Sequence, residues 1–374
     1  MSDTLTPAPP SGTPAAGPQD APNNIVVGMK CGLASFNGEH LDVLRQLPLP
    51  GIMIFVHGVN SDGEWYTQTE EGLCRGLNKR LARNTDQLAF PTAEGGQLVP
   101  ARYISELTPN GFINPDMSAK SFIQTDETFT PVIRFRWGYK ASAKELQDYG
   151  KNIYLNEKDY WGGGPFANGC TALPDLWGAG LDTGIAGPLK VQSVNPTNDR
   201  YVYDCPPRAY YVLAALRLAK LVESLRKKQA DLPITIVCHS QGNMIGMAAA
   251  FLGDKLYKDK GVADTYVLCN PPYSLLDENK PENFMQGNMK DAEGRSGRQS
   301  GAARAKTLAN FFELIRQRKS RQQSADSVDE CMANEAHGYS AKNDRSEHGY
   351  DDSTYGRVTL YCNPHDQVIS SMSV

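Results

Sequence analysis

The sequence has 374 residues, and 40% of them are apolar, which suffices for one large domain with insertions or at most two domains. The formal net charge of −4 gives no reason to expect a nucleic-acid partner. No run of about 18 apolar residues occurs, so the sequence predicts no transmembrane helix.

The 8 cysteines are scattered without a Cys-x-x-Cys pair, and several fall in predicted strands of the core. We therefore expect reduced, buried thiols, no disulfide framework, no metal and no other cofactor, which fits synthesis in a cytoplasm. Residues 1–24 are rich in Pro, Ala, Ser, Thr and Gly and have neither a basic start nor an apolar stretch. We expect a disordered leader there, and not a signal peptide.

After the leader, residues 25–374 alternate between patterns typical of strands and patterns typical of helices. Strands are expected as a pair within 24–36 and at 51–60, 131–138, 234–237, 264–272 and from 357 onward; helices are expected at 70–83, 208–228 and 243–250. The run 51–60 is apolar on both faces, as parallel strands buried on both sides are. This alternation predicts a mostly parallel, doubly wound sheet with helices on both faces and a site at the carboxyl ends of the strands.

Two inserted segments fall outside this alternation. Residues 139–205 contain glycines beside aromatic residues, including the run from Tyr160 to Phe166. Such a segment is either a mobile lid or membrane-contacting surface, or an ordered loop with its aromatics buried. Residues 275–350 include a strongly basic part, 281–323, with an apolar stripe at helical spacing. A basic amphipathic helix there either lies on anionic lipid or docks on the protein through its apolar stripe.

The most informative motif is Cys238-His239-Ser240-Gln241-Gly242, which joins the strand 234–237 to the helix 243–250. A serine in a sharp turn between a strand and a helix is typical of the G-x-S-x-G nucleophile elbow of α/β hydrolases. Strand and helix pass close together there, so the positions two before and two after the serine require small residues. Gly242 meets this requirement, whereas Cys238 departs from the usual glycine. The alternative is an ordinary serine-containing turn.

The strand 51–60 contains His57-Gly58, in a position that matches the loop providing one backbone donor of the oxyanion hole in these hydrolases. The residue after the nucleophile provides the second donor, so we expect the N–H groups of Val59 and Gln241 to form the hole. The catalytic base follows the acid along the chain in this fold, so His57 is expected to shape the loop. Structural roles near the site are expected for His57, Gly58, His239 and Gly242.

The acid is expected in a third motif, where an alternating strand from Arg357 runs into the turn Asn363-Pro364-His365-Asp366. An α/β hydrolase places the carboxylate that orients its histidine at this point, so Asp366 is the expected acid. The alternative is a solvated loop aspartate. His365 is a poor base for the same triad, because adjacent side chains in an extended turn point to opposite sides.

No histidine follows Asp366 in the sequence, although the chain order of the fold requires one there. The base is therefore His337, His348 or His365, out of the usual order, or a residue beyond Val374. We favour the latter and expect this sequence to lack the C-terminal end of the hydrolase fold.

Together, the three motifs resemble those of the lipase effectors of bacterial type VI secretion, in particular their third subfamily. The resemblance covers the chain from Gly51 to Val374. It implies an α/β-hydrolase fold and a phospholipase toxin, exported without a signal peptide, that acts in the periplasm of rival cells. It also implies an immunity protein in the producing cell and a spike or adaptor protein that carries the effector.

We therefore expect hydrolysis of a carboxylic ester in a membrane phospholipid, of the phospholipase A type. Ser240 attacks the acyl carbonyl, a histidine takes its proton and Asp366 orients that histidine. The sequence leaves three alternatives open. They are an esterase, thioesterase or peptidase on the same fold, a catalytically incomplete hydrolase fold that acts as a binding module, and a chain whose base comes from a partner polypeptide.

Overall fold

The computed structural model describes residues 51–83, 97–102, 130–150, 155, 159–178, 180, 204–276, 299–332, 339–349 and 355–366, and the five short strands β1 (Asn24–Val26), β2 (Gly32–Asn37), β3 (His40–Arg45), β8 (Gly184–Ala186) and β9 (Leu189–Lys190). The strands β1, β2 and β3 form an antiparallel sheet, which includes the strand pair expected within 24–36, and β8 pairs with β9. Except for Asn24, the expected leader lies outside the described residues.

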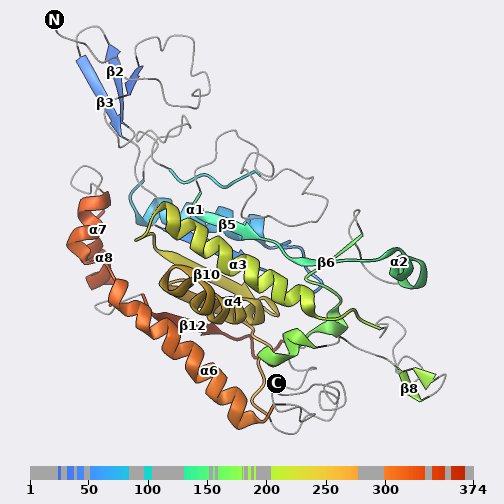
Figure 1. The fold of residues 1–374 in the computed structure, drawn as a ribbon. Helices are drawn as coiled ribbons and strands as arrows, with labels where there is room; N and C mark the ends of the chain where they lie inside the picture. Colours follow the sequence, from blue (N-terminus) through green and yellow to red (C-terminus); the bar gives the residue numbers. More distant parts are fainter. Residues whose placement is uncertain are drawn as a thin grey trace, which may run out of the picture.

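A five-stranded sheet forms the centre of the protein, in the order β12-β11-β10-β4-β5 (Figure 1). Its strands are β4 (Ile52–Val56), β5 (Val132–Phe135), β10 (Ile234–His239), β11 (Thr265–Cys269) and β12 (Arg357–Tyr361). All neighbouring pairs are parallel. Each strand falls where the sequence predicted one, and the predicted α/β class is confirmed.

Helices cover both faces of this sheet. They are α1 (Tyr66–Arg80), α3 (Ala209–Lys228), α4 (Gly242–Tyr257) and α6 (Gly301–Arg316). Alternate residues of β4 point to opposite faces: Ile54 and Val56 pack into the cluster formed with α3, α4 and α6, whereas Phe55 packs against Tyr66 and its neighbours in α1. The helix expected at 70–83 is α1, which begins and ends a few residues earlier than predicted.

Smaller elements complete the described chain: β6 (Gly138–Lys140), α2 (Ala143–Tyr149), β7 (Tyr160–Gly162), η2 (Phe166–Asn168), η3 (Leu173–Trp177), η5 (Lys258–Gly261), η6 (Gln317–Arg321), α7 (Ala325–Met332) and α8 (Ala341–Glu347). In the first inserted segment β6 and β7 form an antiparallel pair, and Tyr160 and Trp161 are buried. Phe166 and Trp177 are exposed. The glycine-rich part that is described is therefore packed onto the protein.

The basic helix of the second inserted segment, α6, docks through its apolar stripe. The Phe311 side chain is fully buried, and its ring centroid lies 5.3 Å from that of Tyr266 in β11 and 6.3 Å from that of Phe251 in α4. Docking is thus the arrangement seen for this helix. Within the described residues, no helix combines the length and apolarity that crossing a bilayer would require.

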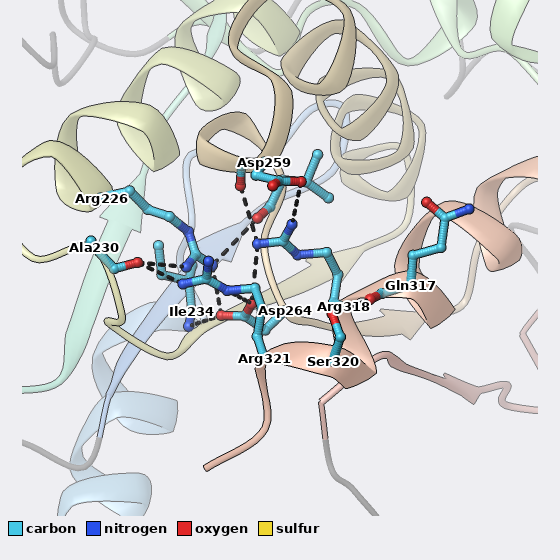
Figure 2. Close-up of polar contacts among 10 residues, drawn as sticks. Arg226, Ala230, Ile234, Asp259, Asp264, Gln317, Arg318, Ser320 and Arg321 are labelled. Atoms are coloured by element: carbon cyan, nitrogen blue, oxygen red, sulfur yellow. Dashed lines mark hydrogen bonds and ion pairs between the residues drawn. The ribbon is translucent and has the colours of Figure 1, made fainter.

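A buried cluster of charges lies at the amino-terminal ends of the central strands and joins them to neighbouring helices (Figure 2). Asp264, just before β11, accepts hydrogen bonds from Arg226 at 2.7 Å and from the Ile234 N–H at 3.0 Å through one oxygen. Its other oxygen lies 3.3 Å from Arg321 and 3.6 Å from Arg318, both in η6. One carboxylate thereby joins α3, β10, β11 and η6.

Candidate active site

The candidate site lies where the strand order of the sheet reverses. The chain passes from β4 to β5 in one direction and from β10 through β11 to β12 in the other, so the loops that leave β4 and β10 diverge over neighbouring strand ends. In open α/β sheets such a switch point forms the crevice in which ligands bind. Gly58 and Val59 follow β4, and Ser240 follows β10 directly.

Ser240 has the backbone conformation of a nucleophile elbow. Its φ is 51°, in the left-handed region that residues other than glycine rarely adopt, and its side chain is half-buried. The Ser240 N–H donates to the Cys269 carbonyl at 2.9 Å. Asn243, fully buried in α4, donates to the carbonyls of Ser240 and Cys269 at 2.7 and 2.8 Å. Sequence reasoning missed this role of Asn243, which pins the strained turn to the neighbouring strand.

Small residues are required around this turn, as predicted from the motif. A Cβ added at Gly242 would lie 2.6 Å from the Val56 carbonyl oxygen, so helix α4 crosses β4 at backbone distance. The unusual Cys238 is accommodated by Gly246, one turn into the helix, because a Cβ there would lie 2.5 Å from the Cys238 sulfur. The strand and the helix therefore still pass close together, because the glycine that the motif usually has at position 238 of the strand is replaced by a glycine at position 246 of the helix.

The loop after β4 lies directly against the serine. A Cβ added at Gly58 would lie 2.8 Å from Cβ and 3.2 Å from Oγ of Ser240. Within the described residues, neither the Val59 N–H nor the Gln241 N–H donates a hydrogen bond. Gln241 is also the N-cap residue of α4, where the helix dipole favours negative charge. These two amides are therefore available to a developing oxyanion.

His57 is engaged through both ring nitrogens. The Trp137 N–H donates to Nε2 at 3.2 Å, so Nδ1 carries the proton and donates to the Gly58 carbonyl at 2.8 Å. The Trp137 indole stacks on the imidazole, with ring centroids 5.4 Å apart, and donates to the His57 carbonyl at 2.9 Å. Burial lowers the pKa of His57 to about 4. A neutral imidazole without a free lone pair cannot take the proton of Ser240.

The loop after β12 presents Asp366 and is fastened to the end of β11 by Asn270. The Asn270 N–H donates to the Tyr361 carbonyl at 2.7 Å, and the Asn270 side-chain oxygen accepts from the Asn363 N–H at 2.7 Å. Burial lowers the pKa of His239, next to Ser240, and the charges of Glu64 and Asp366 oppose that shift. Asp366 is thus near enough to act electrostatically on the residue beside the serine.

The histidines that the sequence offered as bases differ in where they lie relative to Ser240. His348 contacts Asp344 in α8, and Asp344 pairs with Arg80 at the last turn of α1. Helix α1 leads away from the loop after β4 for about 20 Å, so α8 places His348 far from Ser240. His365 is exposed beside Asp366, and His337 lies outside the described residues. Over the described part of the chain, no histidine hydrogen-bonds Ser240, and no cluster of three or more His, Cys, Asp or Glu side chains could hold a metal.

Comparison with known proteins shows the family to which the chain belongs. A family model described as the T6SS Tle3 phospholipase effector domain matches residues 49–374. The chain belongs to the Tle3 family. The antibacterial effector protein Tle3 of Pseudomonas aeruginosa is 32% identical over 305 residues, which cover 74% of this chain and 39% of that relative. The chain therefore spans about two fifths of the length of the Tle3 protein that it matches.

Proposed function

We propose that this chain contains the catalytic serine of an antibacterial phospholipase and that Ser240 is the nucleophile. The observation that carries the proposal is the conformation of Ser240, a non-glycine residue at φ 51° in the turn between β10 and α4. Such strain persists only where the surrounding structure enforces it, and it concentrates at functional sites. Membership of the Tle3 family supplies the substrate class.

In the proposed reaction, Ser240 Oγ attacks the acyl carbonyl of a phospholipid, and the bond between carbonyl carbon and alcohol oxygen then breaks. The backbone amides of Val59 and Gln241 hold the negative oxygen of the tetrahedral intermediate. Loss of one such donor commonly lowers kcat by about a hundred- to a thousandfold. Asp366 orients the histidine that takes the serine proton and returns it to the leaving alcohol.

The contacts of His57 and the location of His348 remove two histidines from consideration as the base. We propose that the base is one of the three remaining candidates: His365, which the structure describes, His337, or a histidine outside these 374 residues. The relative's greater length is compatible with the second source. Replacing His337 or His365 by Gln in turn, in the full-length protein, separates the sources, because only loss of the true base abolishes acyl-enzyme formation.

The biological setting is also proposed from the family. The effector is carried by a spike or adaptor protein of the type VI apparatus and released into the periplasm of a rival cell. Ester cleavage of the phospholipase A type there would damage the membrane. An immunity protein would protect the producing cell.

Replacement of Ser240 by Ala tests the proposal. The Ser240→Ala protein should fold as the parent does and should release no fatty acid from phospholipid vesicles, because no other group supplies the attacking oxygen. Ser346→Ala, in the exposed helix α8, is the matched control and should keep full activity. Short-chain esters and thioesters in the same assay measure substrate preference. Fatty-acid release by Ser240→Ala would refute the assignment.

A further inference from the structure

The loop that carries Val59 is held along one edge by the inserted segment. The Asn60 N–H donates to the Gly164 carbonyl at 3.1 Å, and the Ser61 N–H donates to the Gly162 carbonyl at 2.9 Å. The Gly163 N–H donates in turn to the Trp137 carbonyl at 2.9 Å. The loop thus donates backbone hydrogen bonds to carbonyls about 100 positions away in the sequence, and its shape depends on where those carbonyls lie.

The three consecutive glycines of this segment leave room for that loop. Gly163 and Gly164 have φ values of 64° and 81°, in the left-handed region that favours glycine. A Cβ added at Gly163 would overlap the Gly58 carbonyl oxygen and lie 2.8 Å from Cα of Val59. A side chain at Gly163 would therefore displace the backbone that contains the proposed oxyanion donor.

The same segment also contacts the second proposed donor residue. The Gln241 side chain, 2% exposed, accepts from the Cys170 N–H at 3.1 Å through its oxygen and donates to the Cys170 sulfur at 2.8 Å through its nitrogen. Both ends of the amide are used, so the Gln241 side chain is fixed in one orientation. Cys170 and the glycine run thereby reach the two sides of the hole.

The segment is itself anchored on the start of α3. The Asn168 carbonyl accepts from the Arg208 guanidinium at 2.9 Å and from the Tyr211 hydroxyl at 3.1 Å. The Asn168 side-chain amide donates to the Pro206 carbonyl at 3.0 Å. All four residues are buried, and buried hydrogen bonds of this kind resist opening.

From these contacts we infer that residues 160–170, the buttress, position the two oxyanion donors, with Gly163 and Cys170 as positioning residues. This inference rests on the proposed function, since it needs Val59 and Gln241 to act as donors. It assigns a rigid supporting role to the glycine run, which the sequence also allowed to be a mobile lid. Donors held in advance in the correct place stabilise the transition state without reorganisation.

The first test compares two glycine-to-alanine variants of the full-length protein. In Gly163→Ala, kcat on phospholipid vesicles should fall by about ten- to a hundredfold with KM unchanged, because misplaced donors affect the transition state and not the bound substrate. Gly76→Ala is the matched control, since a Cβ at Gly76 in α1 meets nothing within 4 Å. An unchanged kcat in folded Gly163→Ala would overturn the inference.

The second test guards against misfolding of the glycine variant. Cys170→Ala removes the sulfur that accepts from Gln241 and should lower kcat, whereas Cys170→Ser restores an acceptor and should recover most of it. Equal kcat in all three proteins would contradict the role of Cys170, as would a loss that the serine variant does not recover. Ser240→Ala runs alongside: if it stays active the proposed function fails, and if only the buttress variants stay active the inference alone fails.

Discussion

At the scale of single residues, the uncharged state of His57 sustains the shape of the loop after β4. Its imidazole accepts from the Trp137 N–H and donates to the Gly58 carbonyl, and it is fully buried. A proton on Nε2 would break the first contact and place a charge in the core. The pKa of about 4, below the ordinary 6.5, expresses this cost.

The lowered pKa predicts an acid sensitivity with a defined sign. Between pH 6.5 and 4 the unfolded chain binds a proton at His57 that the folded protein does not, so stability falls as pH falls through this range. The full contribution, about 3 kcal/mol, is present above the unfolded pKa. His57→Gln should flatten the pH dependence of the free energy of unfolding, measured with denaturant, whereas His348→Gln should leave it steep.

The Cys238–Gly246 pair gives a second prediction, in which the effect of one substitution changes sign. Gly246→Ala should destabilise the protein by about 1 to 3 kcal/mol, because the new methyl overlaps the Cys238 sulfur in a packed core. In a Cys238→Gly background the overlap is gone, and the same substitution should stabilise by about 0.5 to 1 kcal/mol, as alanine does in a helix. Urea unfolding of the four proteins checks this. Additive effects would show that the two positions do not compete for space.

At the scale of elements, sequence patterns located the sheet because each strand shows its environment in its own residues. The run 52–56 is continuously apolar, and the strand 234–239 alternates in burial, as its side chains face two different layers. Helix α1 was placed a few residues late. The N-cap residue of α1 makes no side-chain capping bond. Instead, the side-chain hydroxyl of Tyr66, the first helical residue, donates to the carbonyls of Phe55 and Phe135. Those contacts are distant in sequence and leave no local signal.

The same distinction applies to the candidate site. A serine between a strand and a helix is a local signal, and so is His57-Gly58 at a strand end. Asn243 fastens the turn at Ser240 to β11, and Asn270 fastens the loop that contains Asp366 to the end of β11. The partners of both residues become known only from the sheet order. For Asn270 the sequence held a usable clue, an asparagine at the end of a strand, because asparagine tolerates the left-handed conformation that it adopts in the structure, with φ 46°.

The inserted segment could not be interpreted from its own residues. Glycines beside aromatics suit both a lid and a packed loop. The choice depends on hydrogen bonds that the N–H groups of Asn60 and Ser61, in the loop after β4, donate to the carbonyls of Gly164 and Gly162. Trp161 is 1% exposed in the structure whereas Trp177 is 58% exposed, although a glycine follows each of them in the sequence. The roles of residues 139–205 and 275–350 as insertions in one hydrolase domain remain proposals.

At the scale of the whole molecule, the charged cluster around Asp264 joins the sheet to the helices that precede β12. Arg226 comes from α3, and Arg318 and Arg321 come from η6, which follows the docked helix α6. Asp264 and Arg226 are each 1% exposed, so their charges are compensated by each other and not by water. Asp264 precedes β11 and Ser240 follows β10, and these two strands are parallel, so the cluster lies at the opposite end of the strands from Ser240.

Removing the central charge therefore tests how the molecule is held together, separately from its chemistry. Asp264→Asn should destabilise the protein by about 3 to 5 kcal/mol, because buried guanidinium groups lose the carboxylate that compensates them. The matched control is Asp259→Asn: Asp259 also pairs with Arg318, but its side chain is 89% exposed, so the loss should stay below about 1 kcal/mol. Thermal and denaturant unfolding give both values. Because the cluster is remote from the elbow, activity per folded molecule should be the same in both variants. A stable Asp264→Asn protein would mean that packing of α6 alone, through Phe311 and Ile315, secures this part of the fold.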